Sequence, residues 1–361
     1  MKVITILISD GFAGAEHVAY NLLNNLKEDN ILITNQEITK NFLGIEKLKV
    51  YNVGPFFTKN KLSWPIRVLS IRKRLKRIVE KEKPDIMHLI LEWSFLMSSN
   101  LIRTKIPIII SLHGEETKKY IAKSSKVANY YLEEHFKNAS KIISVGAQQI
   151  QNLPERYKKK TIVIPNGVDS KVFKPLKNIK QKNNVILFTG RFIDIKGIHE
   201  IINVAKQLPQ YKFWFAGQGP LANLINLPNT KNLGFKTTEE LVKLYNQATI
   251  CIAPSYRESF GLVGLEAMSC QRAVIATSLG FSEYIENGKD GIIIPAKDEK
   301  ALKEAIVKLL TNDKLRKTLE KNARKKALNY SWDKVAEQYL KVFEQTIKEN
   351  KKFIIWRRVK F

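Results

Sequence analysis

The chain has 361 residues, of which 44% are hydrophobic and 26% are charged, so it can form two domains and is too apolar to be wholly disordered. Its 61 Lys and Arg residues against 34 Asp and Glu residues give a net charge of +27. That excess favours a polyanionic partner: a phosphorylated substrate, an anionic membrane or nucleic acid.

Two observations bear on the compartment. No apolar run approaches the roughly 20 residues of a membrane-spanning helix, and the first nine residues predict a strand, not a secretory signal. Cys251 and Cys270 are expected to be buried without forming a disulfide, as suits a reducing cytosol. We therefore expect a cytoplasmic protein.

Short apolar segments alternate with longer amphipathic segments along the whole chain. Segments that predict strands lie at residues 2–9, 85–91, 106–112, 141–145, 161–164, 184–189, 211–216, 249–253, 273–277 and 291–294. Helical periodicity occurs between many of them, at residues 16–26, 199–207, 238–246 and 300–310. This alternation is typical of parallel sheets with crossover helices, so we expect an α/β fold.

The pattern restarts after residues 162–169. There a strand ends in a Pro-Asn-Gly turn, and a basic, polar segment at 171–184 follows, which we interpret as a linker. We therefore expect two doubly wound, Rossmann-like domains, at residues 1–165 and 166–331. Ligands bind such sheets beyond the carboxyl ends of the strands, so a cleft between two such edges is the expected site.

Glycines and cations follow two of the expected strands. Gly14 precedes the first helix, where a small residue lets the backbone approach an anion at the helix N-terminus. The strand at 184–189 runs into Gly190 and Arg191, and Lys196 follows five residues later. Two cations at the end of a strand would neutralise a diphosphate. The alternatives are a plain turn at Gly14 and solvated cations at Arg191 and Lys196.

A histidine and two glutamates complete the polar positions. His113 follows the strand at 106–112, where it can donate a hydrogen bond to a sugar hydroxyl or else cap a loop. Glu258 is expected in a loop and Glu266 within the next helix, roughly 10–12 Å apart along its axis. Phe260 and Gly261 would open that helix and present N–H groups to phosphate. The pair suits the sugar and the ribose of a nucleotide-sugar, although solvated glutamates at this spacing are common.

As a set, these residues resemble the retaining GT-B glycosyltransferases, in particular the glycosyl transferases group 1 family (family four). The resemblance covers nearly the whole chain and is strongest from Ile162 to Trp332. Its motifs are the residues 164–169, Gly190-Arg191 with Lys196-Gly197, the residues 217–220, Gly234-Phe235, Pro254-Ser255, and the pair Glu258 and Glu266. The resemblance implies a donor domain in the second half, an acceptor domain in the first, and a last helix, within 332–361, that returns to the first domain.

The resemblance also implies a role for each residue. Glu266 would bind the donor ribose and Glu258 the transferred sugar, while Arg191 and Lys196 would clamp the diphosphate. Further donor contacts would come from the residues Gly14, Gly234, Phe235, Ser259, Phe260 and Gly261, and His113 would face the sugar. The family often has Gly-Gly where this chain has Ala13-Gly14, which puts the contact of Gly14 in question.

The implied reaction is transfer, with retention at the anomeric carbon, from a nucleotide-diphosphate-sugar to a hydroxyl of a surface-glycan or glycolipid acceptor. UDP is the expected carrier. Neither a metal nor another cofactor is expected, because the chain contains no Cys and His cluster with metal-ligand spacing and no Asp-x-Asp sequence. Two alternatives remain open: a nucleotide-sugar epimerase of similar architecture, and a catalytically silent module that binds an anionic surface.

Two basic segments favour an anionic membrane as a further partner. Residues 67–83 hold eight Lys and Arg among apolar residues at helical spacing, and residues 351–361 combine cations with bulky apolar residues. Nucleic acid is disfavoured because no nucleic-acid-binding module is recognised. A solvated helix and a frayed end are the alternative. We expect peripheral association with the inner face of the membrane.

Overall fold

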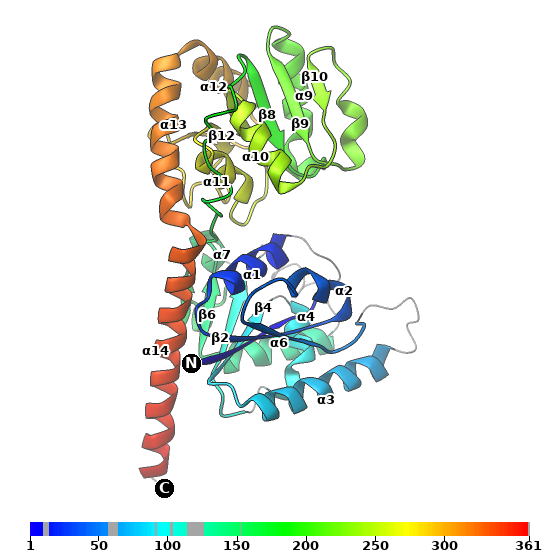
Figure 1. Ribbon diagram of the computed structural model, residues 1–361, viewed down its shortest axis with the longest axis vertical. Helices are drawn as coiled ribbons and strands as arrows, with labels where there is room; N and C mark the ends of the chain where they lie inside the picture. The colour runs from blue at the N-terminus through cyan, green and yellow to red at the C-terminus, as the bar shows by residue number, and fades with distance from the viewer. Residues whose placement is uncertain are drawn as a thin grey trace. The chain divides into compact units, whose positions relative to one another are not determined.

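The computed structural model describes residues 1–9, 14–56, 64–90, 92–101, 104–113, 126–151 and 153–359. Within them the chain divides into two compact units (Figure 1). Unit 1 contains residues 1–165 together with 333–361, and unit 2 contains residues 166–332. Each unit carries a parallel sheet connected by helices, which confirms the expected α/β fold of two Rossmann-like domains.

The sheet of unit 1 has seven parallel strands among the described residues, in the order β3-β2-β1-β4-β5-β6-β7. The strands are β1 (Lys2–Leu7), β2 (Asp29–Thr34), β3 (Leu48–Asn52), β4 (Ile86–Ile90), β5 (Ile108–Leu112), β6 (Lys141–Ser144) and β7 (Thr161–Val163). The central strands β4 and β5 are buried along their whole length. Their near-continuous apolar sequences follow from a sheet that is covered on both faces.

Three longer helices connect these strands: α1 (Gly14–Asn25), α3 (Trp64–Glu82) and α6 (Lys126–Asn138). The shorter helical segments are α2 (Gln36–Thr39), η1 (Lys40–Phe42), α4 (Glu92–Met97), η3 (Ser99–Leu101), α7 (Ala147–Gln151) and α8 (Glu155–Lys158). The apolar face of α3 packs into the core with the strands, because Val68, Ile71, Leu75 and Val79 recur at helical spacing and are all buried.

The last helix, α14 (Trp332–Val359), belongs to unit 1 from its second residue onward. Tyr339 is buried, and its ring centroid lies 5.7 Å from that of His88 in β4. Farther along, Glu349 forms an ion pair with Lys141 at the start of β6, at 3.3 Å. These contacts tie the end of the chain to the sheet formed by its beginning.

The sheet of unit 2 has six parallel strands, in the order β10-β9-β8-β11-β12-β13. The strands are β8 (Val185–Thr189), β9 (Lys212–Ala216), β10 (Thr230–Asn232), β11 (Ile250–Ala253), β12 (Ala273–Thr277) and β13 (Ile292–Ile294). The helices are α9 (Ile198–Gln207), α10 (Thr238–Gln247), α11 (Leu262–Ser269), α12 (Glu299–Thr311) and α13 (Asp313–Ala327), with the short turns η4 (Asp194–Lys196), η5 (Pro220–Leu224) and η6 (Leu328–Tyr330). Thr237 and Glu240 form a capping box at the start of α10.

The strands expected from the sequence are all present, with ends that differ by at most two residues. Three further strands, β2, β3 and β10, were not among them. Residues 48–52 and 230–232 form the edge strands β3 and β10, whose partly exposed side chains leave no apolar run to detect. In contrast, β2 is buried from its second residue, so its apolar run was within reach of the pattern.

The interpretation of residues 171–184 as a linker is wrong, because hydrogen bonds hold this segment against unit 2. The amide of Leu176 donates to Asn246 Oδ1 at 2.8 Å, and the amide of Lys182 donates to the carbonyl of Gln247 at 2.8 Å. Gln181 Nε2 donates to the carbonyl of Ala248 at 3.1 Å. Apart from Gln181, the Lys and Asn side chains of the segment are exposed, so it is polar because it faces solvent while these bonds fix it to unit 2.

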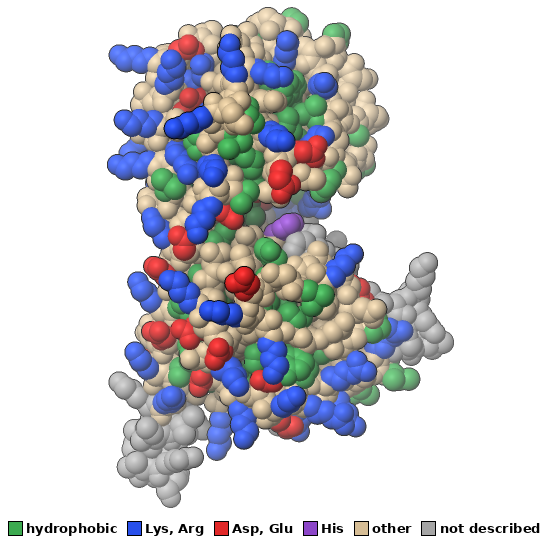
Figure 2. Space-filling model, in the orientation of Figure 1, with side chains coloured by type: hydrophobic (Ala, Val, Ile, Leu, Met, Phe, Trp, Pro, Cys, Tyr) green, Lys and Arg blue, Asp and Glu red, His purple; other side chains and the backbone are tan. Residues whose placement is uncertain are grey.

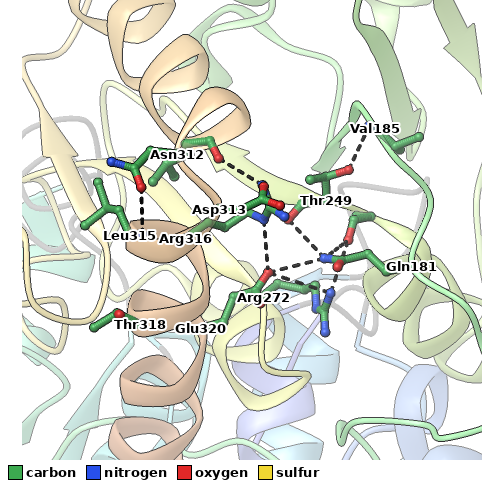
Figure 3. Close-up of polar contacts among 12 residues, drawn as sticks. Gln181, Val185, Thr249, Arg272, Asn312, Asp313, Leu315, Arg316, Thr318 and Glu320 are labelled. Carbon is green, nitrogen blue, oxygen red and sulfur yellow. Dashed lines mark hydrogen bonds and ion pairs between the residues drawn. The ribbon is translucent and has the colours of Figure 1, made fainter.

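A buried charge cluster lies where this segment meets α13 (Figure 3). Glu320 is 6% exposed, and its Oε1 lies 3.8 Å from both Arg272 Nη1 and Arg316 Nε. Gln181 Nε2 also donates to Glu320 Oε1, at 3.2 Å. Burial raises the pKa of Glu320, and the two guanidinium groups oppose that rise. The cluster therefore connects the residue before β12, the helix α13 and the segment 171–184.

Among the described helices, none combines the length and the apolar character that crossing a bilayer requires.

Candidate functional site

The strand order of unit 2 marks one edge of its sheet as the candidate ligand site. β8 and β11 are neighbours, but the chain continues from β8 to β9 on one side and from β11 to β12 on the other. Because the strands are parallel, the loops after β8 and β11 leave the sheet at the same edge, where sheets of this topology commonly bind ligands. Arg191 and Lys196 follow β8, and Glu258 follows β11.

A salt bridge joins the two loops at this edge. Lys196 Nζ donates to Glu258 Oε2, and the two side chains are 17% and 20% exposed. The amide of Tyr256 also donates to the carbonyl of Ile195, at 2.8 Å. The sequence-predicted cation and the first predicted carboxylate are therefore in direct contact in the free protein.

Gly197 makes this close approach of the two loops possible. Its φ is +75°, a left-handed conformation that favours glycine, and it ends the turn η4. A methyl group at this position would lie 2.5 Å from the carbonyl oxygen of Pro254, in the loop after β11. A side chain at residue 197 would therefore push the two loops apart.

Glu266 lies within α11, and a buried tyrosine holds its carboxyl group. Tyr245 Oη donates to Glu266 Oε2 at 2.9 Å. The same hydroxyl lies 2.9 Å from Thr189 Oγ1, at the end of β8. Tyr245 is 1% exposed and packs edge-on against Phe173. The carboxyl group is therefore fixed relative to the end of the central strand.

The electrostatic environment of Glu266 is unlike that of Glu258. Protein surrounds its carboxyl group, although part of the residue still reaches solvent. Burial raises the pKa of Glu266 to about 7, and the hydrogen bond from Tyr245 opposes the rise. Near neutral pH this group therefore changes between a neutral acid and a carboxylate, which accepts hydrogen bonds only.

The helix expected to open at Phe260 and Gly261 begins one residue later, at Leu262. Gly261 is its N-cap, with φ +72°, and a methyl group there would lie 2.4 Å from the ring of Phe281. The ring of Phe260 is 2% exposed and packs against Tyr284 in the core. The side chain of Phe260 therefore cannot serve as a ligand contact, and only backbone groups remain available at that position.

The other residues expected at the site lie in loops of unit 2. Arg191 is exposed, and the described residues include no salt-bridge partner for it. Gly234, with φ +70°, follows β10, and no atom lies within 4 Å of the position a methyl group would occupy. The ring of Phe235 is 69% exposed. Ser259 is partly exposed beside Glu258.

Gly14 and His113 belong to unit 1. Gly14 is the first residue of α1, with no atom within 4 Å of its missing methyl position, while residues 10–13 lie outside the described residues. His113 directly follows β5 and is partly exposed. It is close enough to the buried His88 to lower the pKa of that ring, which burial brings to about 3. Both residues follow carboxyl ends of strands of the same sheet.

Two residues of the site escaped the sequence analysis, Tyr245 and Thr189. Tyr245 lies on the apolar side of an amphipathic helix, where a tyrosine is indistinguishable from a core residue in the sequence. The available signal was Thr189, a hydroxyl at the end of an otherwise apolar strand. Among the described residues no three His, Cys, Asp or Glu side chains are grouped as a metal site requires.

Comparisons with known proteins agree with this architecture. The Glycosyltransferase Family 4 model matches residues 12–172, and the Glycosyl transferases group 1 model matches residues 169–326. An uncharacterized glycosyltransferase of Methanocaldococcus jannaschii is 30% identical over 339 residues, which cover 91% of this chain and 89% of the relative.

Two further proteins are similar to this chain. An N,N'-diacetylbacillosaminyl-diphospho-undecaprenol alpha-1,3-N-acetylgalactosaminyltransferase of Campylobacter jejuni is 29% identical over 243 residues, 62% of this chain and 65% of that protein. The crystal structure of HepE from Anabaena, in complex with UDP and glucose, has a TM-score of 0.80 at 18% identity. The superposition covers 96% of this chain and 100% of the HepE chain, which shows that the two proteins have a common fold.

Proposed function

Because the chain belongs to the group 1 glycosyl transferases and has their GT-B fold of two Rossmann-like domains, we propose that it is a retaining glycosyltransferase. It moves a hexose-type sugar from a nucleotide-diphosphate-sugar, with UDP as the carrier, to a hydroxyl of a glycan or glycolipid. One observation carries the proposal. Lys196 and Glu258 are in contact at the edge of the unit 2 sheet where the loops after β8 and β11 begin, and Tyr245 holds Glu266 in the helix that follows.

The salt bridge of the free protein is exchanged for contacts with the donor. Lys196 turns from Glu258 to the diphosphate, and Glu258 then accepts hydrogen bonds from hydroxyls of the sugar. Arg191, which is exposed, supplies the second cation of the clamp. Since Lys196 is only 17% exposed, its charge acts at reduced dielectric screening. These cations supply the electrostatic stabilisation, so no metal ion is required by the proposal.

The nucleoside lies beyond the diphosphate. Glu266, as a carboxylate, accepts hydrogen bonds from the two ribose hydroxyls while Tyr245 holds its second oxygen. The open backbone at Gly234 and the exposed ring of Phe235 frame the base. The amides of Leu262 and Val263, at the start of α11, face the phosphates together with the amide of Gly261.

Unit 1 supplies the acceptor side. Its candidate polar groups are the ring of His113 after β5 and the amide end of α1 at Gly14. The relative from Campylobacter jejuni acts, by its name, on a sugar carried by diphospho-undecaprenol, which supports a lipid-linked acceptor for this chain as well. A Staphylococcus aureus relative named for capsular polysaccharide biosynthesis supports a surface glycan as the product.

The chemistry breaks one bond and forms one bond at the anomeric carbon. The bond to the diphosphate oxygen breaks, its electron pair stays on the leaving group, and the acceptor oxygen attacks from the same face. The acceptor proton passes to the departing phosphate oxygen. Retention follows because bond formation and bond cleavage share one face. Lys196 and Arg191 lower the barrier by offsetting the charge that develops on the leaving diphosphate.

The proposal is tested in two steps. A panel of nucleotide-sugars is first screened by thermal shift, since a ligand that binds the folded state raises its melting temperature. The stabilising donor is then incubated with a lipid-diphosphate-linked sugar, and the anomeric configuration of the product is read by NMR. Transfer with retention supports the proposal. Interconversion of the donor without acceptor identifies an epimerase, and the absence of binding by every donor identifies a non-catalytic module.

A further inference from the structure

The outer face of α3 carries a surface that the donor site does not use. The helix buries Val68, Ile71, Leu75 and Val79 in the core of unit 1. At 100° per residue, the opposite face carries Ile66, Leu69, Lys73 and Arg77. Ile66 is 72% exposed and Leu69 is 65% exposed. Two large aliphatic side chains therefore face solvent at one end of a row of cations.

The described residues leave the cations of this face without an ion-pair partner. The ion pairs that they give α3 join Lys76 to Glu80, at 3.7 Å, and Glu82 to Lys2 and Lys49. Lys73, Arg77 and Lys81 are exposed, and no carboxylate of the described chain pairs with them. Figure 2 shows Lys and Arg side chains gathered over α3. Their charge therefore remains available to a partner outside the molecule.

We propose that this outer face of α3 docks the protein on an anionic lipid bilayer. Ile66 and Leu69 enter the interface between headgroups and acyl chains, where their exposed aliphatic side chains leave water. Lys73 and Arg77 follow within about 10–17 Å along the helix axis, where they meet anionic headgroups. Exposed aliphatic side chains at one end of a row of cations suit a bilayer, whose acyl chains and anionic headgroups match the two kinds of side chain.

Docking by α3 is independent of the donor site, which lies in unit 2. If the chain transfers a sugar to a lipid-linked acceptor, this surface holds the acceptor-binding unit where such acceptors are found. The basic segment at 351–361 was the other expected membrane contact, but its side chains from residue 352 lie outside the described residues. Variants confined to α3 therefore separate its contribution to vesicle binding from that of the end of the chain.

The full chain is sedimented with vesicles of phosphatidylcholine alone and with vesicles containing about a third phosphatidylglycerol, at low and high salt. Binding only to the anionic vesicles, with loss at high salt, is expected because exposed charges are screened. The variant Lys73→Gln/Arg77→Gln weakens binding about thirtyfold, at roughly fivefold for each cation. Ile66→Ser/Leu69→Ser weakens binding by at least about tenfold through the loss of apolar contact.

The matched control is Lys314→Gln/Lys321→Gln, which removes two exposed lysines from α13 of unit 2. It is expected to bind as the wild type does. Equal loss in this control would show that only net charge matters, and wild-type binding by both α3 variants would assign the contact to residues 351–361. Either result, or equal binding to neutral vesicles, overturns the proposal. Melting temperature and donor binding, expected unchanged in the α3 variants, show that the fold and the donor site are intact.

Discussion

The pH dependence of donor binding follows from the environment of Glu266. Its pKa of about 7 means that half of the free protein carries the neutral acid at neutral pH. The ribose hydroxyls donate hydrogen bonds, so the carboxylate is the form that binds them well. If only the carboxylate binds, the ionised fraction rises about tenfold between pH 6 and pH 8, and the affinity rises by the same factor.

The assay is a calorimetric titration of UDP-glucose over that pH range. A nucleotide-sugar is used because free UDP carries a terminal phosphate that itself titrates near pH 6. In Glu266→Gln the affinity is weaker at high pH and does not change with pH. A wild-type affinity that is flat from pH 6 to pH 8, or an equal slope in Glu266→Gln, would refute this reasoning.

The hydroxyl of Tyr245 sets the midpoint of this titration. Tyr245→Phe removes its hydrogen bond to Glu266, a bond to a charged group worth about 1.5–3 kcal/mol. The pKa of Glu266 should therefore rise by about one to two pH units, and the affinity at pH 7 should fall about fivefold or more. Raising the pH should restore binding, which a misfolded variant would not show. Tyr339→Phe removes a comparably buried hydroxyl from unit 1 and should leave the midpoint unchanged.

Three further predictions concern the stability of the fold. In the free protein Glu266→Gln should be more stable than the wild type above pH 7. The raised pKa of Glu266 gives the wild type a stability that is fully present below pH 4.5 and is lost as the pH rises through about 7, whereas Gln stays neutral and loses nothing. Gly197→Ala should destabilise the protein by about 3 kcal/mol or more, because its methyl group would clash with the carbonyl of Pro254. The control Gly288→Ala has a similar φ but open space around it and should cost about 1 kcal/mol. Urea unfolding measures both costs, and equal values would contradict the packing argument. Glu320→Gln should cost less than about 1 kcal/mol in the same assay, because burial raises the pKa of Glu320 in spite of the two guanidinium groups and the folded state therefore disfavours its charge; a cost of about 3 kcal/mol or more would refute the argument.

Much of the fold could be predicted because parallel sheets leave a strong pattern. Buried strands such as β5 and β11 are almost entirely apolar. Each is followed by a candidate site residue, His113 directly after β5 and Glu258 in the loop after β11. The alternation of strands and helices restarts after residues 162–169, and the boundary between the two units lies in the same range, between Pro165 and Asn166. These features are local in sequence, so periodicity and strand ends are enough to find them.

The parts that could not be predicted depend on contacts between distant residues. Tyr245 meets Glu266 from another helix, and nothing near it in sequence distinguishes it from a core tyrosine. Phe260 resembled a residue at the start of a helix, yet its ring fills the core beside Tyr284. The segment at 171–184 has the composition of a linker, but the Leu176 amide donates to the Asn246 side chain and the Gln181 side chain donates to the Ala248 carbonyl of unit 2.

The account depends on a single exchange, in which Lys196 leaves Glu258 for a diphosphate. Calorimetric titration of UDP-glucose into the wild type, Lys196→Ala and Glu258→Gln tests it most directly, with melting temperatures as the control for folding. Lys196→Ala should weaken binding about ten- to a hundredfold, because a charge-assisted contact to the diphosphate is lost and Glu258 is left to repel it. Glu258→Gln, which frees the cation, should weaken binding less. Wild-type affinity in folded Lys196→Ala would contradict the account.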